Sequence, residues 1–251
     1  MSPVVARITT CIVMLSSLLT AQTAAPAAVK AEIAGKNLRV EFDRMLRSRV
    51  VARFDNRETR LGPFAASESV TTTGNTVKQF AFSSQNTERV NDSIGAGQKL
   101  IVVGKAGDLT KTVAVTIYDK FPAMAFFDVQ YTNSGTANIS ITKWINNAYT
   151  VNAQSKAGIP AFWSYQSGSY EKRPNWVVPL KVNFSQKNYL GMNANDYGGG
   201  TPVLDIWRRD VGIAVGHVEL RPKLVSLPVS MPDSNHAKIA VKLERTIVLK
   251  P

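Results

Sequence analysis

The stretch KLIVVGKAGDLTKTVAVTIYD, residues 99–119, contains two runs rich in β-branched residues with a turn signal between them. The first run ends at Gly104 and the second begins at Lys111, and Gly107-Asp108 lies between them. Val, Ile and Thr favour strands, whereas Gly and Asp favour turns. The stretch therefore predicts two antiparallel strands joined by a short turn.

The same pattern recurs on both sides of this stretch. Strands are predicted at Leu38–Asp43, Arg49–Asp55, Val77–Phe82, Ala123–Asn133, Asn138–Asn146, Val203–Trp207, Gly212–Leu220, Lys223–Met231 and Lys238–Glu244. Glycine, asparagine and aspartate separate most of them, and no stretch holds three turns of clean helical periodicity. Short strands at regular spacing predict an all-β protein, an antiparallel sandwich or barrel, rather than a doubly wound α/β fold.

The N-terminus has the composition of a secretory signal peptide. Arg7 precedes the apolar run ITTCIVMLSSLLTA, and small residues follow it. We expect cleavage after Ala21 or Ala24, so that residues 1–24 are the signal and residues 25–251 form one domain of a secreted or periplasmic protein. An uncleaved anchor is the alternative. Cys11 is the only cysteine, so the mature chain would have no disulfide and no cysteine nucleophile.

The chain carries a formal net charge of +12, and removal of the signal would take away only Arg7. One basic cluster extends from Arg44 to Arg53 and continues with Arg57 and Arg60. No helix-turn-helix, zinc-finger or aromatic RNA-binding motif accompanies it. We expect no nucleic-acid partner; a basic surface that favours an anionic polysaccharide or the cell envelope explains the charge.

Familiar catalytic and cofactor motifs are missing. The segment GAGQKL, from Gly95, lacks the last glycine of a dinucleotide motif and predicts a hairpin turn. His217 and His236 are too few and too far apart for a zinc triad, and His217 is expected to be a hydrogen-bonded structural residue. Gly198–Gly200 precede Thr201-Pro202 rather than a lysine or a helix. They indicate a tight reversal or a close approach to a ligand or another domain, and we expect no metal and no cofactor.

An irregular, aromatic region is predicted from about residue 152 to 201. Its aromatic residues lie among amide and charged residues: Trp163, Tyr165, Tyr170, Trp176, Tyr189 and Tyr197 beside Glu171, Arg173, Asn175, Asn193, Asn195 and Asp196. Aromatic faces pack on the C–H side of a pyranose while polar groups bind its hydroxyls, so the region predicts a sugar site. The alternative is that the tryptophans fill the space between loop and sheet.

Glycoside hydrolysis needs a pair of carboxylates. The candidates in and after this region are Glu171, Asp196, Asp205, Asp210 and Glu219. At strand spacing, DIWRRD puts Asp205, Trp207 and Arg209 on one face and Ile206, Arg208 and Asp210 on the other. An Asp–Arg contact that orders the end of the strand explains these charges without catalysis.

Two motifs resemble the N-terminal domain of melibiase-type enzymes of glycoside hydrolase family 36, best known as α-galactosidases. They are FWSYQSGSYEKRPNWVVPL, from Phe162, and NYLGMNANDYGGGTPVLDIWRRDVGIAVGHVE, from Asn188; LRVEFDRMLRSRVVARFDNRETRLGPF, from Leu38, fits the opening strands. The resemblance implies a large antiparallel β-supersandwich, similar to galactose mutarotase, that packs against a following (β/α)8 barrel. In the family that barrel carries both catalytic aspartates of a retaining mechanism, and N-terminal loops help shape the sugar pocket.

The chain reaches Pro251 without the β-α alternation of a barrel. We therefore expect no catalytic residue in it, and only a substrate-side contribution from Trp176, Asp196, Tyr197, Gly198, Gly199 and Gly200. The expected function is the non-catalytic domain of an exported α-galactosidase-like hydrolase. Its expected partners are a galactoside-like carbohydrate, a C-terminal barrel and, through the full-length enzyme, a second copy of itself. A free-standing carbohydrate-binding module and a structural envelope protein that binds anionic polymer are the alternatives.

Overall fold

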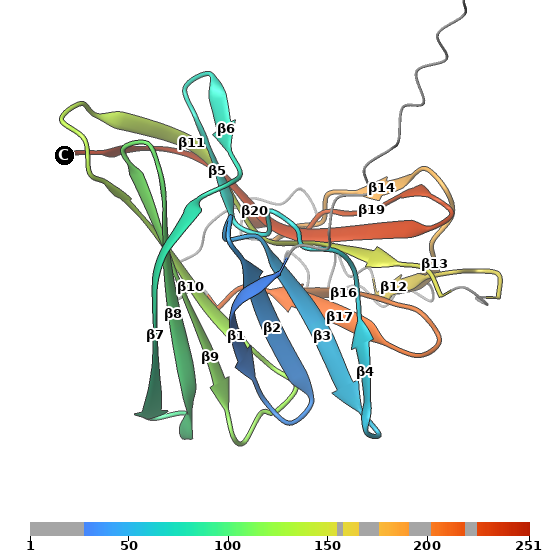
Figure 1. The fold of residues 1–251 in the computed structure, drawn as a ribbon. Coiled ribbons are helices and arrows are strands. Elements are labelled where there is room, and N and C mark those ends of the chain that lie inside the picture. Colours follow the sequence, from blue (N-terminus) through green and yellow to red (C-terminus); the bar gives the residue numbers. More distant parts are fainter. Residues whose placement is uncertain (1–27, 155–157, 166–175, 191–201, 219–224) are drawn as a thin grey trace, which may run out of the picture.

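The computed structural model describes residues 28–154, 158–165, 176–190, 202–218 and 225–251. Within these ranges the chain forms strands and no helix, and every pair of neighbouring strands is antiparallel. The strands make four sheets, one of eight strands and three of four (Figure 1). The prediction of an all-β antiparallel protein is confirmed.

Sheet A is the N-terminal meander. It consists of β1 (Val29–Ala34), β2 (Leu38–Asp43), β3 (Ser48–Phe54) and β4 (Arg57–Arg60), in this order. The β3–β4 turn has two residues, Asp55 and Asn56, with φ of 51° and 59°. Positive φ at both central positions is the geometry that matches the twist of a tight hairpin, and Asn and Asp tolerate it well.

Sheet C contains the stretch at residues 99–119. Its strands are β7 (Ala81–Asn91), β8 (Ala96–Ala106), β9 (Leu109–Tyr118) and β10 (Phe126–Asn133). Strands β8 and β9 pair as predicted, and Gly107 in their turn has φ of 58°. The predicted strand at Val77–Phe82 is interrupted: Val77 ends β6 and Ala81 begins β7, while Phe80 lies between them with its ring fully buried and its N–H bonded to the Met45 carbonyl.

Sheet B connects distant parts of the chain, and sheet D is smaller. The strands of sheet B are β5 (Ser69–Thr72), β6 (Asn75–Val77), β11 (Ile139–Asn152), β14 (Phe184–Gln186), β15 (Tyr189–Leu190), β18 (Val225–Ser226), β19 (Val229–Asp233) and β20 (His236–Leu249). Those of sheet D are β12 (Trp163–Tyr165), β13 (Val177–Pro179), β16 (Val203–Trp207) and β17 (Gly212–Gly216).

Several predicted boundaries therefore need correction. The segment from 152 to 201, expected to be irregular, contains the short strands β12 to β15 in its described part. The strand predicted at Gly212–Leu220 ends at Gly216, and that at Lys223–Met231 is divided into β18 and β19 by Leu227-Pro228. Short strands without clear alternation are held by their partners in the sheet rather than by local propensity.

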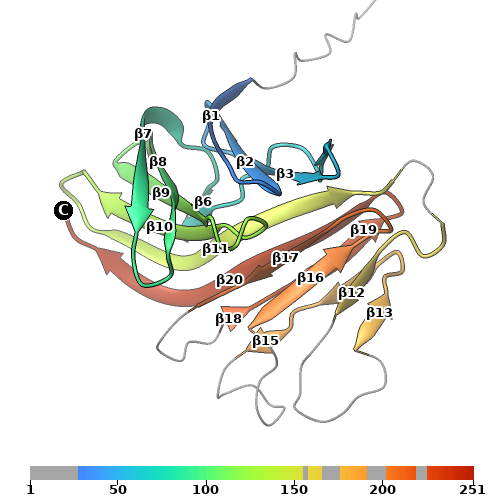
Figure 2. The same ribbon diagram turned by 90° about the horizontal axis from the view of Figure 1, so that it is seen from below.

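The long strands β11 and β20 form the centre of the molecule. Figure 2 shows them running between sheet A on one side and sheet D on the other. Strands β16 and β17 contact β20, and β1 contacts β8 and β9 of sheet C. A single cluster of buried apolar side chains includes members of all four sheets, among them Phe42, Val70, Val113, Ile206 and Ile239.

A polar junction of five buried residues, Ser48, Ser67, Glu68, Lys111 and Tyr149, lies where sheets A, B and C meet. Lys111 Nζ donates to the backbone carbonyls of Leu46, at 3.2 Å, and Glu68, at 3.1 Å. Ser48 Oγ lies 2.6 Å from Ser67 Oγ and 2.9 Å from Tyr149 Oη, and Ser67 Oγ donates to Glu68 Oε2 at 2.6 Å. Hydrogen bonds thus connect segments that are distant in sequence.

Burial shifts the pKa values of the two ionisable groups, Glu68 and Lys111, in this junction. Desolvation raises the pKa of the Glu68 carboxyl group, and the nearby Lys111 charge opposes the rise. Desolvation also lowers the pKa of the Lys111 ammonium group, and Glu68 and Asp43 oppose that change. The Lys111 nitrogen lies 4.7 Å from the centroid of the Phe80 ring, which adds a cation–π contact.

Candidate carbohydrate-binding face

The outward face of sheet D gathers aromatic side chains from strands that are far apart in sequence. Trp163 of β12 and Trp207 of β16 are directly opposite each other in the ladder. Strand register then places Tyr165 opposite Asp205, since side chains two residues apart share a face. We call Trp163, Tyr165, Trp176, Asp205 and Trp207 the aromatic face.

The alternation of β16 explains why these side chains face outward. Leu204 and Ile206 are buried at 1% and 0% exposure and belong to the core cluster, whereas Asp205 and Trp207 are half-buried. Ser164, between Trp163 and Tyr165, is buried on the same inner side. The hydrophobic effect therefore fixes the inner face against β20, and the pleat turns the tryptophans away from it.

Trp176 joins this face from the residue before β13. Its ring packs edge-to-face on Tyr165, with centroids 5.7 Å apart and an interplanar angle of 87°. This is a favourable arrangement because the positive ring edge meets the negative ring face. Trp176 was predicted as a sugar contact, and the structure packs it against Tyr165, a member of the face that was not among the expected substrate contacts.

Asp205 supplies the carboxylate of the face. Its Oδ1 accepts a hydrogen bond from the backbone N–H of Tyr165 at 2.7 Å, and its backbone carbonyl accepts one from Ser164 Oγ at 2.5 Å. Partial burial raises the pKa of the Asp205 carboxyl group, and the Tyr165 hydrogen bond opposes the rise. The Tyr165 bond thus holds one carboxylate oxygen, and the Ser164 bond holds the backbone of the same residue.

Strand β17 gives the face a low border. Gly212, Ala214 and Gly216 pair with Trp207, Asp205 and Val203 respectively, and all three small residues are exposed. A Cβ at Gly212 would lie 2.6 Å from Trp207 Cβ, so this position requires glycine for the strand to approach the tryptophan. A flat ligand can therefore reach the rings from the side of β17.

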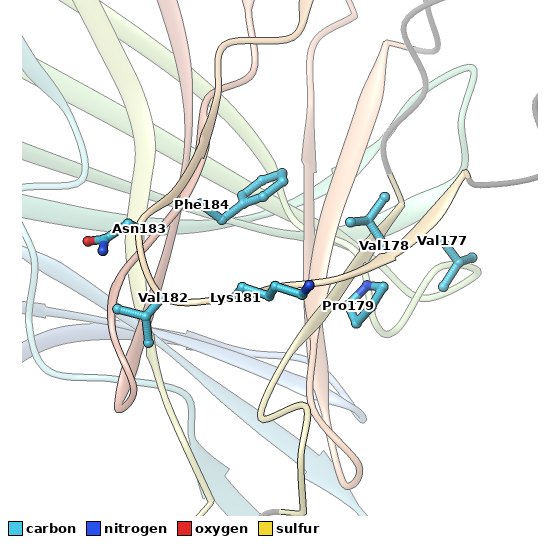
Figure 3. A pocket seen from close by; sticks show the side chains of 7 residues that line it. All are labelled: Val177, Val178, Pro179, Lys181, Val182, Asn183 and Phe184. Atoms are coloured by element: carbon cyan, nitrogen blue, oxygen red, sulfur yellow. The ribbon is translucent and has the colours of Figure 1, made fainter.

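On the opposite border, an open hollow of about 730 Å³ lies beside β13. Figure 3 shows its lining, which comprises Val177, Val178, Pro179, Lys181, Val182, Asn183 and Phe184. Val177 and Val182 are 54% and 49% exposed, and Lys181 and Asn183 are the polar residues of the lining. All seven lining residues belong to the single segment 177–184, so the hollow is an open depression of the surface beside β13.

The charges that follow β16 stabilise the fold. Arg208 is buried at 7% exposure, and its Nε donates to Asp210 Oδ1 at 2.7 Å while a second nitrogen donates to the Asn152 carbonyl. This confirms the predicted Asp–Arg contact at the end of the strand. Asp210 is thus engaged structurally, and Asp205 is the carboxylate of this segment that lies on the aromatic face.

The other predicted residues divide into two groups. Asp196, Tyr197, Gly198, Gly199 and Gly200 lie outside the described residues, as do Glu171 and Glu219, and their roles stay predictions. Trp163 and Tyr165 belong to the predicted sugar region and Asp205 was a candidate carboxylate, but neither they nor Trp207 were among the expected substrate contacts. Their signal was the tryptophan in each of two short alternating segments, WSY and VLDIW.

The histidines lie away from the aromatic face or at its edge. His236 Nδ1 lies 2.8 Å from Asp233 Oδ1 at an exposed hairpin, and the backbone N–H of His217 donates to the Pro202 carbonyl at 3.1 Å. Within the described ranges no three His, Cys, Asp or Glu side chains are grouped closely enough to hold a metal ion. The same ranges include no helix of sufficient length and apolarity to traverse a membrane.

Half of the arginines in the basic cluster, and Arg39 before it, form ion pairs. Arg39 contacts Glu58 at 2.7 Å, Arg49 contacts the buried Glu41 at 2.5 Å, and Arg53 contacts Glu58 at 3.1 Å. Arg47 Nε donates to the buried Asp43 at 2.7 Å. Three of the six arginines of this cluster, Arg47, Arg49 and Arg53, are therefore engaged with acids of the protein itself, as is Arg39 before it.

Comparison with known proteins relates the fold to part of a glycosidase. No family model and no curated protein matches the sequence. The α-N-acetylgalactosaminidase NagBb from Bifidobacterium bifidum, in complex with Gal-NHAc-DNJ, is similar to 87% of this chain over 35% of its own length, with 13% identity and a TM-score of 0.54. The GalNAc complex of that enzyme is similar over the same 87% of this chain and 35% of its own length, with 11% identity and a TM-score of 0.46. The chain thus spans about a third of this neighbour, and the likeness is one of fold.

Proposed function

We propose that this chain is the non-catalytic β domain of an exported α-galactosidase-like glycosidase, and that its aromatic face contacts the sugar. The observation that carries the proposal is the grouping of Trp163, Tyr165, Trp176 and Trp207 around the fixed carboxylate of Asp205. Rings offer the apolar surface that a pyranose needs, and a carboxylate held by one oxygen leaves acceptor capacity for a hydroxyl.

The fold comparison supports the glycosidase part of the proposal. The similar region is about a third of a larger enzyme whose name and ligands concern N-acetylgalactosamine. The resemblance of the motifs from Phe162 and Asn188 to α-galactosidase N-terminal domains points to the same class of sugar. In this proposal a separate barrel performs the chemistry, and Trp176, with Asp196, Tyr197 and Gly198–Gly200 near it in sequence, helps shape the entrance to its pocket.

A free-standing carbohydrate-binding module is the second candidate. It is favoured by the fact that the described aromatic face is built from one sheet of this chain and rests on the chain's own core. Such a module would bind galactosides without any barrel. A structural protein that binds anionic polymer is less well supported, because Arg39, Arg49 and Arg53 of sheet A are paired with acids within the fold.

Titration of the isolated chain with α-galactosides, followed by tryptophan fluorescence and calorimetry, tests both candidates. If the face binds sugar alone, Trp207→Ala and Trp176→Ala should each weaken binding about tenfold, the loss of roughly one aromatic contact. Phe54→Ala is the matched control, because Phe54 is an exposed aromatic residue of sheet A, outside the aromatic face.

Absence of binding by the chain alone would reject the free-standing module. The dependent domain would then be tested by adding a family barrel in trans and assaying an activated α-galactoside. Stimulation that Trp207→Ala removes supports the proposal, and no stimulation contradicts it. Turnover by this chain alone, abolished by Asp205→Asn, would contradict the non-catalytic assignment.

A further inference from the structure

Strand β7 forms one edge of sheet C and is the leftmost strand of that sheet in Figure 1. It extends over eleven residues, Ala81–Asn91, which is about twice the usual length of a strand. Within the part of the chain that the structure describes, β8 is the only strand that pairs with β7. The other side of β7 is therefore available to a further strand, and it lies apart from the aromatic face of sheet D.

The hairpin that follows β7 shows which residues direct their backbone groups to this side. The N–H of Asp92 donates to the Gly95 carbonyl at 3.1 Å. Along an antiparallel ladder, hydrogen-bonded pairs alternate with pairs whose N–H and C=O groups point away from each other. Counting back from Asp92, the residues that point away from β8 are Gln85, Thr87, Arg89 and Asn91. We call the backbone groups of these four residues the open edge.

A bulge ends the open edge on the side of Phe82. The register of β7 with β8 shifts between Phe82 and Ser84. Before this bulge, the N–H of Phe82 donates to the carbonyl of Arg44, in the β2–β3 turn, at 2.9 Å. A further strand can thus pair with residues 84–91, and the hairpin at Asp92 sets the other limit.

Both faces of β7 lie in water along the open edge. Gln85 and Thr87 share a face with the buried Val102 and Leu100 of β8, but both are exposed because β7 projects past the core. Proteins usually guard an exposed edge strand with charged side chains or proline. Residues 83–87 contain neither, so the middle of this long edge is not protected against pairing.

We propose that the open edge pairs with the open edge of a second copy of this chain, antiparallel and with Thr87 on the twofold axis. Such an isologous contact joins the same surface of both copies. Thr87 would lie opposite Thr87 of the second copy, and Gln85 opposite Arg89 of the second copy. All these residues would present N–H and C=O groups to each other, so that the two C sheets continue across the axis.

Side-chain chemistry selects this register. An axis at Glu88 would place this carboxylate directly opposite its own copy, and an axis at Arg89 would do the same with a guanidinium group; like charges directly opposite destabilise a ladder. An axis at Asn86 would move the pairing into the bulge and shorten it.

The axis at Thr87 places hydroxyl opposite hydroxyl and leaves no like charges opposed. Glu88 would lie opposite Asn86 of the second copy, whose side-chain amide can donate to the carboxylate. Gln85 would offer its side-chain carbonyl to Arg89 of the second copy. The strand is therefore complementary to itself, which is why we infer a second copy rather than an unrelated chain as the partner.

Cysteine cross-linking of the 251-residue chain tests the register. All variants carry Cys11→Ser, so that the introduced thiol is the only one. Thr87→Cys should form a disulfide-linked dimer under mild oxidation, because residues directly opposite at a hydrogen-bonded pair have Cα atoms about 5.5 Å apart, within disulfide range. Thr132→Cys is the matched control and should stay largely monomeric, because Thr132 is an exposed threonine of β10, the opposite edge strand of sheet C.

Sedimentation equilibrium measures the association itself. The unmodified chain should show a monomer–dimer equilibrium, and Thr87→Lys should weaken it about tenfold or more, because two ammonium groups would face each other on the axis. Thr132→Lys should leave it unchanged. Thr87 is exposed, so unchanged thermal unfolding should show that the fold of each variant is intact.

Three results would overturn the proposal. The first is a chain that stays monomeric at millimolar concentration, and the second is a dimer that Thr87→Lys does not weaken. The third is equal cross-linking of Thr87→Cys and Thr132→Cys, which would indicate random collision rather than a defined edge.

Discussion

The polar junction and the aromatic face use the same β-sheet alternation in opposite ways. At the junction, Lys111 and Glu68 are polar residues at inward positions, and both are fully buried. On sheet D, Trp163 and Trp207 are large apolar residues at outward positions, and both are half-exposed. Each region departs from the rule that apolar residues face inward, and the two departures have different consequences.

At the junction the departure stabilises the structure. A buried ammonium group needs acceptors, and Lys111 finds them in the carbonyls of Leu46, in the β2–β3 turn, and Glu68, just before β5. On sheet D the outward tryptophans contribute little to packing of the core, because Leu204 and Ile206 already fill the inner side of the sheet. Mutations should therefore separate the regions: the junction governs unfolding, and the aromatic face governs binding.

The largest effect is expected for Lys111→Met. This change removes both hydrogen bonds to backbone carbonyls and leaves Glu68 buried without its cation, so the free energy of unfolding should fall by about 4 kcal/mol. Urea denaturation followed by fluorescence measures it. The double variant Lys111→Met with Glu68→Gln should recover a large part of this loss; a single variant as stable as the wild type would show that the junction does not hold the sheets together.

A smaller effect is expected in the pH dependence of stability. Because burial raises the pKa of Glu68 above the unfolded value of 4.5, the folded protein binds this proton more tightly. The resulting stabilisation is present below pH 4.5 and is lost as the pH rises through the folded-state pKa. Glu68→Gln should remove this loss, so that its stability relative to the wild type improves with pH.

Denaturation of the wild type and Glu68→Gln at several pH values between 4 and 8 measures this difference. Glu88→Gln serves as a control, because Glu88 is an exposed residue of β7 that contacts Lys99. A constant difference between Glu68→Gln and the wild type across this range would contradict the assignment. The lowered pKa of Lys111 acts with the opposite sign: stability rises with pH between the folded-state pKa of Lys111 and its unfolded value of 10.5.

The smallest effect on stability is expected for Trp207→Ala, at about 1 kcal/mol, because this side chain is only partly buried and lies outside the core cluster. Its neighbour Ile206 is the matched control: Ile206→Ala should lower the free energy of unfolding by about 3 kcal/mol. Sugar binding should show the reverse order, with Trp207→Ala the more damaging. Equal losses of unfolding free energy in the two variants would contradict the prediction that Trp207 contributes to binding rather than to the core.

Much of the fold was predictable wherever alternation was strong. The predicted strand Leu38–Asp43 coincides with β2, and the runs at 99–104 and 111–119 lie in β8 and β9 apart from Asp119. The strand β7 was missed because AFSSQNTERVN is polar and almost wholly exposed, so that only its ladder with β8 identifies it. The burial of Lys111 follows from strand alternation, because Lys111 lies on the same side of β9 as the buried Val113, Val115 and Ile117.

The candidate site was less predictable, because it depends on a pairing across a long separation. Composition indicated an aromatic region, but Trp163 and Trp207 meet only through the register of β12 with β16. Likewise, Trp176 contacts Tyr165 across a segment that sequence periodicity does not define. Local patterns specify which side of a strand a residue occupies, whereas tertiary contacts specify its neighbours.

The hydrogen bonds of Lys111 have a consequence for the order in which the chain can fold. Its ammonium group can lose water without penalty only when the carbonyls of Leu46 and Glu68, from two other parts of the chain, are already in place. Sheet C would therefore dock after the segments that carry Leu46 and Glu68 have come together, and not before. Amides near all three segments would be expected to exchange with solvent together, as one cooperative unit.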